Sequence, residues 1–380
     1  MSKHLSPWRR IANAFWLLLN TLLAAALIVT AYAGCVSPVE RPVFGVVVLS
    51  FPIWLAALAV VLVLDLIWWR RTALVAVAAI AAAWPMVRDT CPLNIGGGIP
   101  NGTPAERVFT LLTYNAYNFT DRTGSYPDDT NPGLSFILRT DADIVCIQEM
   151  QLFEQQPARH IWQAQLDSLH ARYPYIVLSG YAVAIMSKFP VTPIHLDVKS
   201  RERGNYCDVG AYVVEVEGRR LALFNVHLQS YSLTEDDKAA YRGLTRLRPD
   251  EDIHELRNTL LYKLELAAMR RARQAQMLAR YVEYYGGENV VVCGDFNDVP
   301  GCYTLRTLAD AGLREVWPEV AFGPTWTYND NRFYFRIDHV LWRGALRPVD
   351  IERFRVPYSD HYPLLTTFVW DSASDEIHHQ

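Results

Sequence analysis

The chain has 380 residues, of which 51% are hydrophobic, and a formal net charge of -4 at pH 7. Of its 36 basic and 40 acidic residues, seven basic and three acidic ones precede residue 100, so residues 100–380 carry a net charge of -8. This excess of acids disfavours a protein that lives on long polyanions, although a metal site also concentrates acids.

Residues 1–89 predict a membrane segment. Apolar runs at 11–33 and 43–64 are long enough to cross a bilayer as helices, and a third run at 72–87 is nearly so. Arg9 and Arg10 flank the first run, and Arg70 and Arg71 separate the second from the third. A buried soluble helix could explain any one of these runs, but not three in succession with basic flanks.

The basic residues also predict an orientation, because cytoplasmic loops are rich in Lys and Arg. Placing both basic clusters inside requires three crossings and puts the chain after residue 88 outside the cytoplasm. If the third run lies in the interface instead, the following domain is cytoplasmic. A lipoprotein signal ending at Ala33-Gly34-Cys35 is an alternative, but Tyr32 stands where an aliphatic residue is expected. We expect a multi-pass protein of a bacterial inner or cell membrane, with its following domain extracytoplasmic.

Residues 90–105 are rich in Gly and Pro, which is typical of a linker. Residues 106–371 have the pattern of one α/β domain, and residues 372–380 form a polar tail. Short apolar runs predict strands at 108–115, 144–147, 183–188, 211–216, 221–226, 290–295, 325–328, 336–341 and 364–370. Helices are predicted at 134–140 and 252–284. The basic cluster of the second helix (Arg270, Arg271 and Arg273) is most simply a solvated face, and otherwise a contact to phosphate or anionic lipid.

Polar side chains occur at six of the predicted strands or strand ends. They are Asn115, Glu149, His227, Asp295 with Asn297, Asp338, and Asp360 with His361. Four carboxylates gathered at one edge would repel one another without a cation. An oxygen-rich ligand set without sulfur favours Mg²⁺ or Mn²⁺ over zinc, and the six cysteines form no Cys-x-x-Cys pair. The sequence therefore predicts metal-assisted phosphoester hydrolysis.

These residues also carry a family resemblance. The motifs are Tyr114-Asn115, Gln148-Glu149, Asn225-Val226-His227, Gly294-Asp295-Phe296-Asn297, Ile337-Asp338-His339 and Ser359-Asp360-His361-Tyr362-Pro363. Their order resembles that of the endonuclease/exonuclease/phosphatase superfamily, which includes deoxyribonuclease I-like nucleases and neutral sphingomyelinases. The resemblance covers residues 106–371. It implies an α/β fold, a four-layer sandwich of two packed mixed sheets flanked by helices, here preceded by about three transmembrane helices.

The resemblance implies a role for each residue. Glu149 corresponds to the main ligand of Mg²⁺ or Mn²⁺, and Asp360 to a further ligand. Asn115 would orient the acid or the water on the metal, and it would also be a ligand of the metal and a contact of the phosphate. Asp295 and Asn297 would orient the nucleophile and hold the phosphate, with Asp295 as a ligand of any second metal.

The catalytic base implied by the resemblance is His361, polarised by Asp338, which activates water for in-line attack on phosphorus. His227 corresponds to a histidine that binds phosphate and either stabilises the transition state or helps the leaving group. The resemblance implies no covalent intermediate.

Together these inferences predict a membrane-anchored, divalent-metal-dependent phosphoester hydrolase of the phosphodiesterase type. The expected substrate is a phospholipid-like or small phosphodiester, because the domain is acidic and tethered to a bilayer through its N-terminal helices. An extracytoplasmic endonuclease or exonuclease is the alternative. A silent membrane-tethered binding domain is disfavoured, since Glu149, Asp295 and His361 are all present. The sequence indicates no protein partner.

Overall fold

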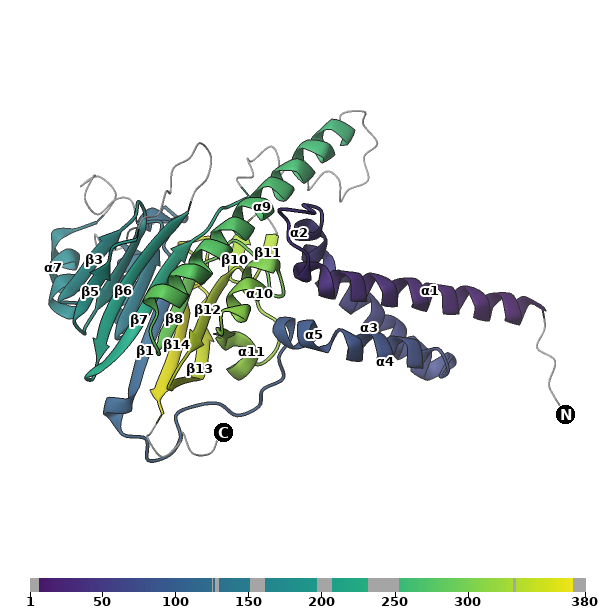
Figure 1. Cartoon of the computed structure of the whole chain (residues 1–380), viewed down its shortest axis with the longest axis horizontal. Coiled ribbons are helices and arrows are strands. Elements are labelled where there is room, and N and C mark those ends of the chain that lie inside the picture. Colours follow the sequence, from purple (N-terminus) through teal and green to yellow (C-terminus); the bar gives the residue numbers. More distant parts are fainter. Residues whose placement is uncertain are drawn as a thin grey trace.

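The computed structural model describes residues 7–124, 126, 130–150, 161–196, 207–231, 253–330 and 333–371. Two six-stranded mixed sheets form the centre of the described α/β domain (Figure 1). The first has the order β13 (Leu346–Arg353), β14 (Leu364–Trp370), β1 (Val108–Asn115), β2 (Ile144–Gln148), β4 (Val183–Ser187) and β3 (Tyr175–Ser179). The second has the order β5 (Val191–Ile194), β6 (Asp208–Val216), β7 (Arg219–His227), β8 (Val290–Asp295), β12 (Asp338–Arg343) and β9 (Arg314–Glu315). A separate ribbon pairs β10 (Tyr328–Asp330) with β11 (Phe333–Phe335).

Successive side chains of a strand point to opposite faces of the sheet, and in the central strands both sets are apolar, so both faces of each sheet are buried. In β1, Leu111 packs between the sheets, whereas Leu112 packs outward. In β8, Val291 packs between the sheets, whereas Val290 and Val292 face outward. Both faces of these strands therefore need a cover, which helices provide.

Helices complete four layers, as predicted. The outer face of the first sheet packs against α6 (Pro132–Thr140) and α7 (Gln163–Arg172). The outer face of the second sheet packs against α9 (Ile253–Tyr285) and α10 (Tyr303–Asp310), while α11 (Val316–Val320) adds to the core between the sheets. Short 3-10 turns lie at η3 (Ala105–Arg107) and η4 (Tyr117–Phe119).

Two late strands begin later than predicted. The run at 325–328 forms a strand only from Tyr328, and the run at 336–341 only from Asp338. At the start of β12, Ile337 and Asp338 donate their backbone N–H groups to the Thr327 side chain, each at 3.0 Å. Cys146 and Cys293 lie in the core between the sheets, and all six cysteines are free thiols.

The N-terminal segment consists of apolar helices that extend away from the α/β domain (Figure 1). They are α1 (Pro7–Tyr32), η1 (Ala33–Cys35), α2 (Phe44–Val47), η2 (Val48–Ser50), α3 (Phe51–Trp68), α4 (Ala73–Ala82) and α5 (Trp84–Thr90). The stretches Pro7–Cys35 (29 residues) and Phe44–Trp68 (25 residues) are long and apolar enough to cross a membrane. The third predicted span is bent by 73° between α4 and α5, so it counts as a span only if the bent pair is taken as one.

The two basic clusters lie at the same end of this segment, away from the α/β domain (Figure 1). Trp16 near the start of α1 stacks on Trp69 after the end of α3, with ring centroids 4.8 Å apart. Trp69 also donates its Nε1–H to Asn13 Oδ1 at 3.0 Å. This arrangement is the one that the three-crossing prediction requires, although the side of the membrane stays a prediction.

The N-terminal segment is packed onto the α/β domain. Apolar side chains from α1, α3 and α4 share one core cluster with α9, α10 and the outer face of the second sheet. The linker is also held: Asn94 donates its side-chain amide to the carbonyl oxygens of Pro318 and Ala321, both at 3.0 Å. The domain boundaries at 89, 105 and 371 stay predictions.

Candidate active site

Strand register brings three of the predicted residues together on the second sheet. His227 at the end of β7 pairs with Asp295 at the end of the parallel strand β8. Asp295 in turn pairs with Asp338 at the start of the antiparallel strand β12. The three side chains therefore stand in a row across one edge of the sheet.

The first sheet contributes Asn115 and Glu149 to the same edge. Asn115 Nδ2 donates to Glu149 Oε1 at 3.1 Å and to Asp295 Oδ2 at 3.0 Å, so one amide joins the two sheets. The Asn115 oxygen accepts from the backbone N–H of Tyr117 at 3.2 Å, which fixes the orientation of the amide. Glu149 has a positive φ of 56°, a sparsely populated conformation for a residue with a side chain, and strain of this kind gathers at functional sites.

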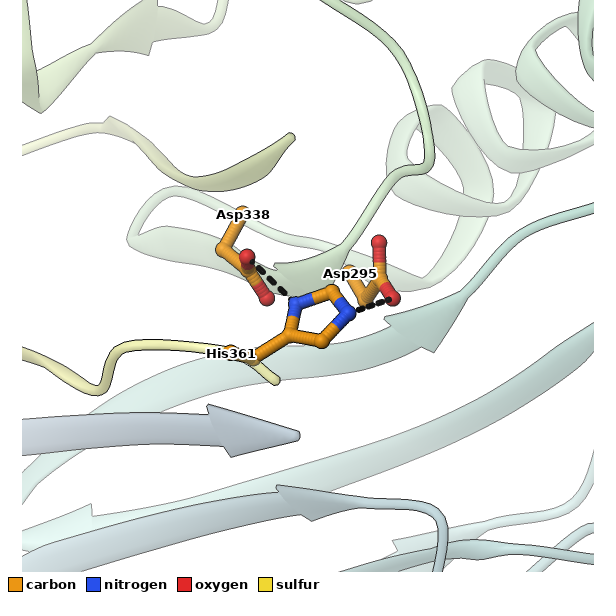
Figure 2. Close-up of side chains that lie close together, drawn as sticks. All are labelled: Asp295, Asp338 and His361. Carbon is orange, nitrogen blue, oxygen red and sulfur yellow. Dashed lines mark hydrogen bonds and ion pairs between the residues drawn. The ribbon is translucent and has the colours of Figure 1, made fainter. Parts of the chain in front are cut away.

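His361 lies between two carboxylates (Figure 2). Its Nδ1 is 2.8 Å from Asp338 Oδ2, and its Nε2 is 3.6 Å from Asp295 Oδ2. The Asp338 contact leaves Nε2 as the nitrogen that faces the cavity. All three side chains are buried, so solvent screens their interactions weakly.

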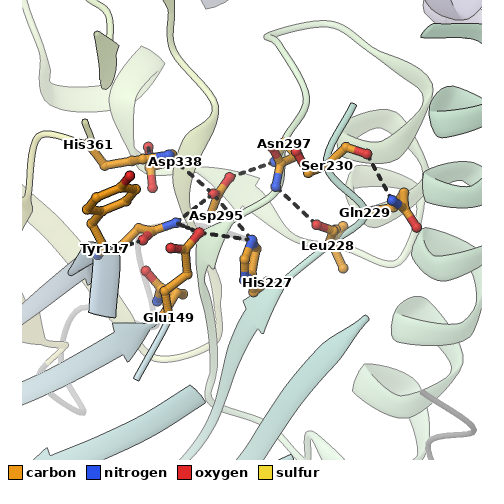
Figure 3. Close-up of polar contacts among 12 residues, drawn as sticks. Tyr117, Glu149, His227, Leu228, Gln229, Ser230, Asp295, Asn297, Asp338 and His361 are labelled. Carbon is orange, nitrogen blue, oxygen red and sulfur yellow. Dashed lines mark hydrogen bonds and ion pairs between the residues drawn. The ribbon is translucent and has the colours of Figure 1, made fainter. Parts of the chain in front are cut away.

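His227 and Asn297 lie on the other side of Asp295 (Figure 3). His227 Nε2 is 3.7 Å from Asp295 Oδ2 and 3.9 Å from Glu149 Oε1. The backbone N–H of Asn297 donates to Asp295 Oδ1 at 2.8 Å, and its side-chain amide donates to the Leu228 carbonyl oxygen at 3.0 Å. The Asn297 amide thus anchors the chain that follows His227, while the residue still lines the cavity described below.

The charges of the site perturb its ionisable groups. Burial raises the pKa of Asp295, and the neighbouring Asp338 raises it further. Burial also raises the pKa of Asp360, to which the charge of Glu149 adds. Burial alone would lower the pKa of His361, but the negative charges of Asp338 and Asp295 raise it well above its usual value. The site therefore has an excess of negative charge and favours a positive partner.

The donor set fits a divalent cation. Asp295, Asp338 and His361 each offer one ligand atom, and these atoms lie within 4.8 Å of one another. In addition, Asp360 Oδ1 is buried and has no hydrogen-bond partner among the described residues. Buried carboxylate oxygens of this kind are ligands for hard cations.

Several supporting residues were not predicted as part of the site. The Ser359 hydroxyl donates to the Asn115 carbonyl oxygen at 2.9 Å and accepts from the His361 N–H at 3.1 Å, so it joins β1 to the loop that carries His361. Its place two residues before His361 is a serine-turn signal that could have identified it. Thr327 has the corresponding role for Asp338, and no local pattern points to it.

Two polar residues of the recognised motifs are structural in this chain. Gln148 Nε2 donates to Asn225 Oδ1 at 2.6 Å, which links the two sheets below the site. Asn225 Nδ2 donates to the carbonyl oxygens of Ile147 and Ala184, both at 2.9 Å. Both side chains are fully buried, so their hydrogen bonds fix how the two sheets meet.

The prediction that the basic cluster of α9 is a solvated face is wrong for Arg271. This side chain is fully buried, with Nε 3.3 Å from Asp298 Oδ2 and its guanidinium 4.2 Å from the centre of the Tyr231 ring. It also donates to the Gln229 carbonyl oxygen at 3.0 Å. The carboxylate of Asp298, directly after Asn297, compensates the positive charge of the buried guanidinium.

The site opens into a cavity of about 750 Å³. Six of the eight predicted site residues line it: Glu149, His227, Asp295, Asn297, Asp360 and His361. Asn115 and Asp338 do not line it but contact residues that do. Its volume lies in the range of small-molecule sites, roughly 300–1,000 Å³. An acid-rich centre with two histidines at the base of such a cavity can accept a ligand that carries phosphate oxygens once a cation offsets the charge.

Two family models match the chain. A model described as the Endonuclease/Exonuclease/phosphatase family matches residues 112–361, and a second, described as a Domain of unknown function (DUF8431), matches residues 13–90. No curated protein matches the chain.

Similar solved structures include an endonuclease/exonuclease/phosphatase from Beutenbergia cavernae DSM 12333, with 19% identity, a TM-score of 0.48, and coverage of 70% of this chain and 72% of that one. A family member from Bacteroides vulgatus has 16% identity and a TM-score of 0.46, covering 70% of this chain and 99% of that one. D. rerio TDP2 complexed with single strand DNA product has 16% identity and a TM-score of 0.43, covering 69% of this chain and 98% of that one. Because the family model spans more than half of the sequence, the chain belongs to the endonuclease/exonuclease/phosphatase family.

Proposed function

We propose that this protein is a membrane-anchored phosphoester hydrolase of the phosphodiesterase type, dependent on Mg²⁺ or Mn²⁺. The family includes phosphodiesterases and nucleases, and its enzymes use divalent metals. The observation that carries the proposal is the 2.8 Å contact between Asp338 and His361, with His361 Nε2 directed at Asp295 inside an acid-rich cavity.

In this proposal His361 is the base. Asp338 holds its Nδ1. The charges of Asp338 and Asp295 raise the pKa of His361, and a cation held at Asp295 would offset part of that charge, so that Nε2 can take a proton from the water that attacks phosphorus. The new bond joins phosphorus to the water oxygen, and the bond to the leaving oxygen breaks. His227, 3.7 Å from Asp295, is placed to donate to a phosphate oxygen.

The cation would be held by Glu149, Asp360 and Asp295, with Asn115 orienting Glu149 and Asp295. Asp338 and His361, the other two members of the cluster around Asp295, would serve as the orienting acid and the base and not as ligands. When bound, it supplies positive charge against the phosphate oxygens. The unpartnered buried Asp360 Oδ1 and the raised pKa of Asp295 support this assignment. The substrate is a phospholipid-like or small phosphodiester.

Hydrolysis of bis-p-nitrophenyl phosphate tests the proposal. The full chain with Mg²⁺ releases p-nitrophenolate, and EDTA abolishes the release. His361→Ala lowers kcat by about 10²–10⁴-fold, while the control His170→Ala, an exposed histidine of α7, leaves it unchanged. Equal activity of both variants would contradict the assignment, and no turnover of any ester would indicate a binding protein.

Parallel digestion of plasmid DNA and of phospholipid vesicles distinguishes the two enzyme classes. We expect lipid turnover, and DNA cleavage without lipid turnover would establish the nuclease alternative. We also propose that the α/β domain lies outside the cytoplasm, which the shared position of the two basic clusters supports (Figure 1). A reporter fused after Asp89 tests this, and activity of that reporter only in the cytoplasm would reverse the orientation.

A further inference from the structure

The cavity over the active site has a second, apolar end that the mechanism does not use. Val46, Leu49 and Ile53 of the N-terminal segment line it together with Leu260 and Leu264 of α9. These residues come from parts of the chain about 200 positions apart. The membrane segment therefore supplies one wall of the active-site cavity.

Close backbone contacts hold this wall against the α/β domain. A Cβ added to Gly45 of α2 would lie 2.4 Å from Ala268 Cβ, so α2 packs directly on α9. A Cβ on Gly34 would lie 1.9 Å from the Gly301 carbonyl oxygen, which places η1 against the turn before α10. Arg306 adds a hydrogen bond from Nη2 to the Ala31 carbonyl oxygen at 3.0 Å. These contacts fix the position of the wall relative to the α/β domain.

The apolar end also lies where a helix with the properties of a membrane span begins. Ile53 is in the first turn of α3, and 66% of its side chain is exposed. From there α3 continues to Trp68, away from the α/β domain (Figure 1). The alkyl chain of a ligand bound beside Ile53 would therefore extend along an apolar helix.

The lining disfavours a polyanion. No Lys or Arg is among the described residues that line the cavity, whereas binding of nucleic acid relies on such residues along its backbone. The combination of one acid-rich end, which a cation neutralises, with one hydrocarbon-like end matches a molecule that has a phosphoester at one end and an alkyl chain at the other.

We infer that the surface formed by Val46, Leu49, Ile53, Leu260 and Leu264 is a hydrocarbon-binding subsite that takes the alkyl or acyl chain of an amphiphilic phosphoester. The inference rests on the proposed hydrolase function and adds the substrate class that the cavity selects. In this arrangement the membrane segment is a specificity element as well as an anchor.

A series of alkyl p-nitrophenyl phosphodiesters (methyl, butyl, octyl and dodecyl) tests the subsite, since only the chain changes. The full-length protein is assayed with Mg²⁺ in a non-ionic detergent at fixed concentration. We expect kcat/KM to rise with chain length, by up to about fourfold for each methylene that becomes buried. An equal kcat/KM for all four esters would overturn the subsite.

Two substitutions on α3 give a matched pair. Ile53→Trp fills the apolar end, and we expect it to lower kcat/KM for the octyl ester by about tenfold, the equivalent of two methylenes. It leaves the methyl ester unaffected, which shows that the variant is folded. Val60→Trp is the control, at a residue that is 61% exposed and does not line the cavity. We expect its kcat/KM to rise with chain length as much as that of the wild type.

The outcomes separate the inference from the proposed function. Equal losses in Ile53→Trp and Val60→Trp, or hydrolysis without any dependence on the chain, would refute the subsite and leave the hydrolase in place. Failure of the wild type to hydrolyse even the methyl ester would refute the hydrolase and with it the subsite, whereas full activity of His361→Ala would refute only the role of His361 as the base.

Discussion

Glu315 connects the α/β domain to the end of the N-terminal segment, and its replacement by Gln is a sharp test of that connection. Its carboxylate accepts a hydrogen bond from Arg336 Nη1 and lies 2.6 Å from His339 Nδ1. Arg336 donates through Nη2 to the Asp89 carbonyl oxygen at 2.6 Å, and His339 Nε2 lies 2.9 Å from the Asp298 carbonyl oxygen. Loss of the Glu315 charge leaves two buried partners without their anion.

The magnitude follows from the pKa of Glu315. Burial alone would raise this pKa, but the charges of Arg336 and His339 lower it from 4.5 to about 2. That difference corresponds to about 3 kcal/mol of stability. Because the pKa is lower in the folded state, the contribution is complete above the unfolded pKa of 4.5 and is lost as the pH falls toward 2.

Thermal unfolding of the full chain and of Glu315→Gln, measured at several pH values, tests this. At pH 7 we expect the variant to unfold about 5–10 °C lower, and the difference should shrink as the pH falls below 4.5. Glu319→Gln is the control, since Glu319 forms an exposed pair with Arg88 at 3.0 Å and its loss should cost less than about 1 kcal/mol. A difference that stays constant with pH, or equals that of the control, would refute the reasoning.

Three other changes have expected outcomes. Asp338→Asn removes the charge that holds His361 Nδ1, so kcat for bis-p-nitrophenyl phosphate should fall by about 10²–10⁴-fold with little change in unfolding temperature. Gly294→Ala places a Cβ 2.0 Å from the Val226 carbonyl oxygen and should destabilise the fold by several degrees, whereas Gly218→Ala, also at positive φ but with open space, should cost only about 1 kcal/mol. Asn225→Leu removes one acceptor of Gln148 Nε2 and one donor to each of two buried carbonyl oxygens, so chemical denaturation should show a loss of about 2–4 kcal/mol, and a loss below that range would show that the link between the sheets is dispensable.

Much of the site could be predicted because its polar residues stand out from the short stretch of sequence around each of them. Asn115, Glu149, His227 and Asp295 each come at or directly after the end of a buried strand, where an ionisable or amide side chain has no structural reason to be. The apolar helices of the N-terminal segment could be predicted equally well, since a long apolar run is recognised from the sequence without knowledge of what it contacts.

The supporting contacts were not predictable in the same way. Arg271 has the appearance of a surface residue in a basic cluster, and only the packing of α9 places it against Asp298. Thr327 accepts hydrogen bonds from the backbone N–H groups of Ile337 and Asp338 at the start of β12, although it lies ten and eleven residues earlier in the chain. Such contacts join residues that are distant in sequence, and no local pattern encodes them.

The sequence by itself determined the family, the α/β class and the polar residues that gather at the strand ends, because alternation and strand-end chemistry are local properties. Only the tertiary structure decided that His227, Asp295 and Asp338 share one register, since pairing between distant strands sets it. The tertiary structure also decided that α2 and α3 wall the cavity. That contact depends on glycines at 34 and 45 that let two backbones approach, a fit that exists only when both surfaces are folded.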